Sequence, residues 1–247
     1  MEILDEKEDL LVLLYPVFSG NSPRIVNEWI QLQNKVDNTS AVIISVSGGG
    51  EISPNTASRV KCKKQLKRKG YNIFYENMLI MPSNCIVRTK EDLAIRLLKV
   101  LPEKVNNIIN QIMKVNKHIM KPLLIDRFLS LIFILESIGA KRFGRKIKIT
   151  DSCISCSLCE KNCPTENIKM IDGKPSFGNK CIMCLKCIYS CPKNALKSGV
   201  FKSMVFEEGF NLKRIEDKLD KKDLQPVSDL AKGYIWKGVK EYLKDYD

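Results

Sequence analysis

The chain has 247 residues and a formal net charge of +13, because 41 Lys and Arg residues outnumber 28 Asp and Glu residues. Its 44% hydrophobic content excludes a disordered protein and can support the core of one large domain or two smaller ones. The acidic start excludes a basic secretory signal, and no run of about 18 apolar residues predicts a transmembrane helix. We therefore expect a cytoplasmic protein whose excess cations are mainly solvated and favour an acidic partner over nucleic acid.

Residues 1–118 alternate apolar, strand-like runs with helical patterns, which is typical of an α/β fold with a parallel sheet. Strands are predicted at Asp9–Pro16, Ala41–Ser47 and Tyr71–Pro82. The first of these runs is continuously apolar, as a strand buried on both faces would be. Ser22 and Ser53, each followed by proline, are expected to cap helices, and a longer helix is predicted from Glu91 to about Lys117.

Residues 119–147 are predicted to be a connector between two domains. It contains an apolar helical stretch from Leu123 to Ile138, followed by the basic sequence GAKRFGRK. We expect the helix to dock on the preceding domain, with binding to a membrane surface as the alternative. Residues 200–247 form a charged tail in which a short helix is predicted from Leu230 to Leu243.

Eight of the ten cysteines form two quartets with identical spacing, C-x2-C-x2-C-x3-C-P. The first quartet is Cys153, Cys156, Cys159 and Cys163, and the second is Cys181, Cys184, Cys187 and Cys191. In a reducing compartment such close thiols hold metal more often than they form disulfides. The remaining two, Cys62 and Cys85, are expected to be buried or half-buried thiols.

This spacing lets three thiolates on a tight loop bind three iron atoms of a [4Fe-4S] cluster, while the fourth cysteine points to the other cluster. We therefore predict one cluster on Cys153, Cys156, Cys159 and Cys191, and a second on Cys181, Cys184, Cys187 and Cys163. Zinc is the alternative metal, but zinc sites give no reason for two matching triplets that each end in Cys-Pro.

Each quartet is followed by a predicted short helical turn that carries one apolar residue, Ile168 or Leu196, and MIDGKPSF between them predicts a hairpin. Residues 148–199 resemble the bacterial ferredoxins with two [4Fe-4S] clusters, which are small α+β domains. The resemblance implies that single electrons pass between the two clusters and on to docked partners.

The first segment resembles the carboxy-terminal part of a flavodoxin. YPVFSGNSP, residues 15–23, is similar to the loop after the third flavodoxin strand, and SVSGGGEISP, residues 45–54, to the loop after the fourth. The resemblance implies an FMN ring site lined by Phe18, Ser19, Gly20 and Asn21 from one loop and by Ser47, Gly48, Gly49 and Gly50 from the other. Over residues 9–199 the chain thus resembles the flavodoxin-ferredoxin fusion family, the EFR-type ferrodoxins.

One departure from that family concerns the start of the chain. Flavodoxins open with a strand and a Ser/Thr- and Gly-rich loop before a helix that holds the FMN phosphate, and Met1 stands just before what would be the third strand. Three explanations are open: the start of the chain is misassigned or the gene is fragmentary, a separate chain supplies the missing half of the flavodoxin domain, or the remaining half serves only as a docking platform. FMN is accordingly a weaker expectation than the clusters.

These features predict an electron-transfer protein without catalytic residues of its own, which exchanges single electrons with a flavin or with a redox partner protein that has an acidic surface. The first alternative is a small FMN-dependent oxidoreductase fed by its own clusters. The second is a basic iron-sulfur protein bound to nucleic acid or a membrane surface, which would need the cations of residues 61–69 and 141–146 to form one continuous face.

Overall fold

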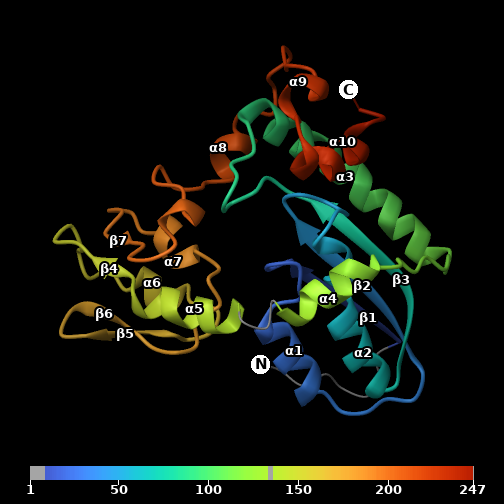
Figure 1. Cartoon of the computed structure of the whole chain (residues 1–247), viewed down its shortest axis with the longest axis horizontal. Coiled ribbons are helices and arrows are strands. Elements are labelled where there is room, and N and C mark those ends of the chain that lie inside the picture. The colour runs from blue at the N-terminus through green and yellow to red at the C-terminus, as the bar shows by residue number, and fades with distance from the viewer. Residues whose placement is uncertain (1–8, 133–135, 247) are drawn as a thin grey trace. The chain divides into compact units, whose positions relative to one another are not determined.

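The computed structural model describes residues 9–132 and 136–246, which form two compact units (Figure 1). The first unit takes the described residues of 1–83, 89–133 and 213–247, and the second takes those of 84–88 and 134–212. The expected connector and the expected tail are therefore each divided between the two units. No helix in the described ranges is both long enough and apolar enough to cross a membrane.

The first unit is built on a three-stranded parallel sheet, which confirms the expected α/β architecture. The strands β1 (Leu10–Pro16), β2 (Thr39–Ser47) and β3 (Tyr71–Ile80) lie in the order β1-β2-β3. The helices of its first part are α1 (Arg24–Leu32), η1 (Asn55–Ala57), α2 (Val60–Arg68), α3 (Glu91–Met113) and α4 (Leu124–Ile132). All three predicted strands and the long predicted helix are thus present.

The two faces of this sheet are covered unequally. On one face, Leu11, Leu13 and Tyr15 of β1 belong to a buried cluster with residues of α1 and α2. On the other face, α3 packs against β2 and β3. Val12 and Leu14 of β1 point to that second face, because they pair in register with Val42 and Ile44, which lie in the cluster under α3. The side chains of Val12 and Leu14 are nevertheless 52% and 61% exposed. The prediction that β1 is buried on both faces is wrong, because the side chains of α3 cover only the other two strands.

The two predicted helix caps are also wrong. Helix α1 begins at Arg24 with Pro23 in the cap position, and the Ser22 hydroxyl donates a hydrogen bond to Asn27 Oδ1 instead, at 3.2 Å. Ser53 precedes the 3-10 helix η1, and α2 begins only at Val60. The Ser53 hydroxyl donates instead to the fully buried Asp126 of α4, at 2.5 Å. Ser22 therefore makes a local contact with a side chain of α1, whereas Ser53 makes a tertiary contact, and neither serine caps a helix.

The end of the chain completes the hydrophobic core of the first unit. It contains α8 (Lys213–Glu216), α9 (Val227–Leu230), η4 (Tyr234–Trp236) and α10 (Lys237–Leu243), where we predicted one helix over residues 230–243. Trp236, Val239 and Leu243 are buried in one cluster with Ile80 of β3 and Leu97 of α3. The charged tail thus carries an apolar face that packs on the sheet end and on α3.

The second unit is assembled from short elements. They are α5 (Glu136–Arg145), β4 (Lys148–Ile149), α6 (Leu158–Lys161), β5 (Ile168–Ile171), β6 (Lys174–Phe177), α7 (Lys186–Tyr189), β7 (Leu196–Lys197) and η3 (Lys202–Met204). Strand β4 pairs antiparallel with β7, and β5 with β6. The predicted hairpin is confirmed, with Asp172 and Gly173 in its turn at positive φ.

Two local predictions for the second unit need correction. The helical turns expected at Ile168 and Leu196 are wrong, because both residues lie in strands and are only 2% exposed. The predicted apolar helix over 123–138 corresponds to α4 and the start of α5, and its residues 133–135 lie outside the described residues. Helix α5 continues beyond the predicted helical stretch, through most of the basic GAKRFGRK sequence.

Candidate metal centre

The first three cysteines of one quartet and the last cysteine of the other line a common cavity. The cysteines are Cys153, Cys156, Cys159 and Cys191. Three of them lie in the loop before α6 or in α6 itself, whereas the fourth follows α7. Leu158, Met170 and Leu196 complete an apolar lining around the thiols. The cavity therefore offers four sulfur ligands in a largely apolar lining.

The other four cysteines, Cys181, Cys184, Cys187 and Cys163, lie close enough to influence one another's ionisation. Burial, followed by the charges of Cys184, Cys181, Cys163 and, from the other set, Cys159, raises the pKa of the Cys187 thiol to about 12. Burial is also the main cause that raises the pKa of Cys184, to which Cys163 adds. Four thiolates can share this space only if a bound cation or cluster offsets their charge.

The two cysteine loops have the same backbone conformation. Ser155 and Ser157 in the first loop and Met183 and Leu185 in the second, at matching positions between the cysteines, all have φ between 55° and 62°. This left-handed conformation is uncommon for residues other than glycine. Its recurrence at equivalent positions shows that the two loops follow the same local backbone path there.

Both fourth cysteines also receive a backbone hydrogen bond at an equivalent position. The N–H of Asn167 donates to Cys163 Sγ at 3.2 Å, and the N–H of Ala195 donates to Cys191 Sγ at 3.3 Å. Hydrogen bonds to ligand sulfurs stabilise the thiolate and are one of the factors that set the reduction potential of a cluster.

Helix α5 is part of this site, although the sequence analysis assigned it to a connector. Phe143 is 1% exposed and packs in one cluster with Leu185 and Ile188 of the second loop and α7. At Gly144, an added Cβ would lie 2.5 Å from Cys181 Cβ, so the helix backbone needs glycine there. The sequence signal for this contact is the Phe-Gly pair inside an otherwise basic segment.

In the part of the chain that the structure describes, there is no group of three or more Cys, His, Asp or Glu side chains that could hold a single metal ion. This agrees with the thiol-lined cavity, because each cysteine of a [4Fe-4S] cluster binds a different iron atom and the four need not converge on one point. The eight thiols therefore fit clusters in number, in grouping and in loop geometry.

The comparison with protein-family models agrees with this geometry. Residues 140–196 match the 4Fe-4S dicluster domain. They form a ferredoxin-like iron-sulfur module, and its match begins inside α5, in line with the packing of that helix on the second cysteine loop. No curated protein and no solved structure matches the chain. The iron-sulfur domain suggests a role in electron transfer.

The two remaining cysteines lie outside the quartets, as expected. Cys62 is fully buried in the first unit, 2.9 Å from the Tyr15 hydroxyl, and burial raises the pKa of its thiol to about 11. Cys85 is half-buried in the second unit beside Phe143 and Leu185. Burial raises the pKa of Cys85 as well, so both thiols are protonated at neutral pH.

The residues that resemble a flavin site lie on neighbouring loops of the first unit. Phe18–Asn21 is a tight turn after β1, closed by hydrogen bonds of 2.9 and 2.8 Å between its end residues. The loop of Ser47, Gly48, Gly49 and Gly50 follows β2, and the N–H of Gly50 donates to Ser47 Oγ at 2.8 Å. Gly20 touches Pro54, at the end of the second loop. The turn and the loop therefore adjoin at the carboxyl ends of β1 and β2.

The end of the chain lies against the second of these loops. An added Cβ at Gly238 would stand 2.3 Å from the Gly49 carbonyl oxygen and 3.1 Å from Gly50 Cα. This backbone-to-backbone approach requires glycine in α10. A cavity of about 1080 Å³ lies beside the contact and is lined by Ile52 of the loop after β2, Met78 of β3 and Tyr234 and Lys237 of the tail, among others.

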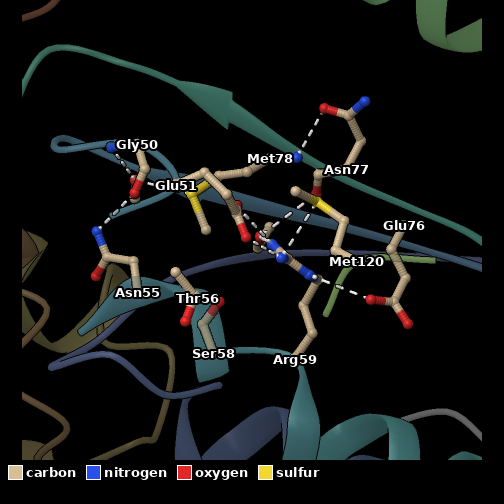
Figure 2. A network of polar contacts seen from close by, with 12 residues as sticks. Gly50, Glu51, Asn55, Thr56, Ser58, Arg59, Glu76, Asn77, Met78 and Met120 are labelled. Carbon is tan, nitrogen blue, oxygen red and sulfur yellow. Dashed lines mark hydrogen bonds and ion pairs between the residues drawn. The ribbon is translucent and has the colours of Figure 1, made fainter. Parts of the chain in front are cut away.

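A buried ion network lies close to this loop, and the sequence analysis did not anticipate it (Figure 2). Arg59 is 2% exposed, forms a close ion pair with Glu51, and donates to Ser45 Oγ at 2.7 Å. Its Nε also lies 3.6 Å from the carboxylate of Glu76, which is 1% exposed and pairs with Lys63 at 2.6 Å. The network joins the loop after β2, the residue before α2, and β3.

Proposed function

We propose that the chain is an electron-transfer protein that holds two [4Fe-4S] clusters. The supporting observation is that the last cysteine of each quartet groups with the first three of the other, in loops of matching backbone conformation. The proposed ligands are Cys153, Cys156, Cys159 and Cys191 for the first cluster and Cys181, Cys184, Cys187 and Cys163 for the second. Each bound cluster would supply a site that gains and loses one electron.

The test is anaerobic purification followed by measurement of iron, sulfide and electron paramagnetic resonance. The Cys163→Ala variant should lose mainly the signal of the second cluster, and Cys191→Ala mainly that of the first. Cys85→Ala removes a thiol of the same unit that ligates neither cluster and should keep the full iron content. Protein without iron and sulfide would rule out the proposal, and identical losses in both ligand variants would rule out the exchanged ligands.

We further propose that the first unit is a flavodoxin-like domain that places FMN near the two loops. The proposal is supported by their position at the carboxyl ends of parallel strands, where open α/β sheets bind ligands. The proposed contacts are Phe18, Ser19, Gly20, Asn21, Ser47, Gly48, Gly49 and Gly50. Quenching of FMN fluorescence would measure binding. Phe18→Ala should weaken it, Leu32→Ala on the exposed end of α1 should not, and an absence of quenching by the unchanged protein would refute the flavin site.

A second candidate function is a small FMN-dependent oxidoreductase fed by its own clusters. The cavity of about 1080 Å³ in the first unit favours it, because substrate pockets have volumes of this order. Turnover of a substrate with flavin bound, and its loss on filling the cavity with Ala231→Trp, would support this candidate. The structure gives less support to the alternative of nucleic-acid binding through the basic residues 61–69. Lys63 pairs with Glu76, and Lys69 donates a hydrogen bond to the carbonyl oxygen of Gln31 at 2.7 Å, so both ammonium groups already have partners within the chain.

A further inference from the structure

Two lysines of the ferredoxin-like module stand directly opposite each other in a sheet. Lys148 of β4 and Lys197 of β7 are register partners in a ladder of only two residue pairs, and both side chains are exposed. Like charges that face each other across antiparallel strands are destabilising. Within the described ranges neither lysine forms an ion pair. The repulsion between them would be relieved by an anion bound from outside.

These lysines line a cavity that is shaped to receive such a group. Its volume is about 350 Å³, and Lys202 adds a third ammonium group to its lining. The aromatic rings of Tyr189 and Phe206, whose centroids are 6.5 Å apart, form an apolar part of the wall. Glu207 supplies the one carboxylate among the described lining residues, and it is exposed. The lining therefore has a positive surplus around an apolar wall.

The same cavity lies next to the first set of cluster ligands. Leu196 lines both this cavity and the one formed by Cys153, Cys156, Cys159 and Cys191. It is 2% exposed, whereas the next residue, Lys197, is exposed, as the alternation of side chains along a strand requires. A group that enters the lysine-lined cavity is thus close to the cluster site, with the Leu196 side chain in the shared wall.

We propose that an acidic redox partner protein docks at Lys148, Lys197 and Lys202 and exchanges electrons with the first cluster past Leu196. A partner carboxylate placed between Lys148 and Lys197 relieves their repulsion, and a protein rather than a small anion is favoured because the apolar wall also needs a covering. One electron passes from the reduced cluster to an oxidised centre of the partner, with no bond made and no proton moved. This inference rests on the electron-transfer function proposed above.

Two forms of one acceptor protein test the docking surface. Native cytochrome c is basic, and succinylation of its lysines makes it acidic while the haem remains the oxidant. Stopped-flow mixing with the reduced holoprotein at low salt should give faster reduction of the succinylated form, with a rate that falls as salt is added. The double variant Lys148→Gln/Lys197→Gln should slow that reaction about 3- to 10-fold and leave the native cytochrome c rate unchanged or higher.

The matched control is Lys161→Gln/Lys174→Gln, which removes two exposed lysines of α6 and β6 from the same unit and keeps the same net charge as the test variant. An equal slowing in both double variants would mean that only overall charge matters and would overturn the docking site. Phosphate binding lost in the test variant without a change in either electron-transfer rate would indicate a small-anion site and would also overturn it. Failure of the unchanged holoprotein to reduce either acceptor would instead count against the electron-transfer function itself.

Discussion

The two units of the molecule differ in what stabilises the inside of each. The first has strands of seven to ten residues, a helix of 23 residues and apolar clusters on both faces of its sheet. In the second, α6 and α7 have four residues each, and β4 and β7 have two. Elements this short are not stable by themselves. We therefore expect side chains alone to order the first unit, and we expect the second unit, despite its cluster around Phe143, to depend on what its thiols bind.

The charged and polar groups in the two interiors differ in the same way. In the first unit, Arg59 and Glu76 are buried as partners of each other and of nearby groups, so their charges are compensated within the chain. In the second, the hydrophobic cluster around Phe143 includes Cys159, Cys181 and Cys187. As thiolates these would be uncompensated, so their stabilisation has to come from iron.

The largest expected effect is that of iron removal. Chelation of iron under denaturant-free conditions should unfold residues 148–199, because the free energy of metal binding is then lost from a unit whose helices and strands are short. Amide hydrogen exchange should show protection lost throughout β5, β6 and α7 and kept in β2 and β3. Both tryptophans, Trp29 and Trp236, lie in the first unit, so their fluorescence should stay unchanged.

The Cys62→Ala variant provides the control for that experiment, since it removes a buried thiol from the first unit and should leave the iron content intact. Retention of full protection at β5 and α7 after complete loss of iron would mean that the second unit folds without clusters, and the distinction between the two units would then fail.

The next largest effect is expected in the first unit. Arg59→Met should lower its free energy of unfolding by about 3 kcal/mol, because it leaves the buried Glu76 with one partner and Glu51 with none from this network. Urea unfolding followed by tryptophan fluorescence measures the change without a contribution from the second unit. Arg24→Met, which removes an exposed pair with Glu28, should cost no more than about 0.5 kcal/mol. Equal costs for the two variants would show that burial of the Arg59 network adds nothing.

The sequence predicted the ferredoxin-like iron-sulfur module, which the family match supports, because the information for it is local. In each quartet three cysteines lie within seven residues, and this spacing is the basis of the proposed exchange of the fourth ligand. The sheet was predictable for a similar reason, since each strand contains a short run rich in apolar residues. The exposure of Val12 and Leu14 was not predictable in this way, because it depends on where α3 lies and not on the sequence of β1.

The contacts that sequence reasoning missed all join segments that are distant along the chain. Arg59 and Glu76 belong to separate secondary-structure units, and neither residue stands in a recognisable motif. The tail was predicted to be charged and to contain one short helix, but its packing on the core through residues such as Trp236 and Val239 was not predicted. Gly238 allows the backbone of another segment to approach closely. In the sequence, such a glycine cannot be distinguished from a glycine in an ordinary turn.

The contact of Gly238 with the second loop predicts a smaller effect. Gly238→Ala should lower the free energy of unfolding of the first unit by about 1–3 kcal/mol, since the new Cβ meets backbone rather than a movable side chain. Lys237→Ala, at the adjacent exposed helical position, should change it by less than about 0.5 kcal/mol. Tryptophan fluorescence during urea unfolding measures both. An unchanged stability in Gly238→Ala would show that α10 can move away from Gly49 without cost.

The smallest expected effect concerns acid and lies within the first unit. A hydrogen bond of 2.6 Å from Lys221 Nζ, followed by one of 3.1 Å from the N–H of Gln225, holds the pKa of the Asp92 carboxyl below its ordinary value. Because the folded pKa is the lower one, this contribution is fully present above the unfolded value, about pH 4, and is lost as the pH falls through the folded value. In a Trp29→Phe background, Trp236 fluorescence should therefore report a pH-dependent loss below about 1 kcal/mol between roughly pH 5 and pH 2. Asp92→Asn should remove that part of the pH dependence, whereas an identical pH profile would mean that the tail is held on α3 by its apolar contacts alone.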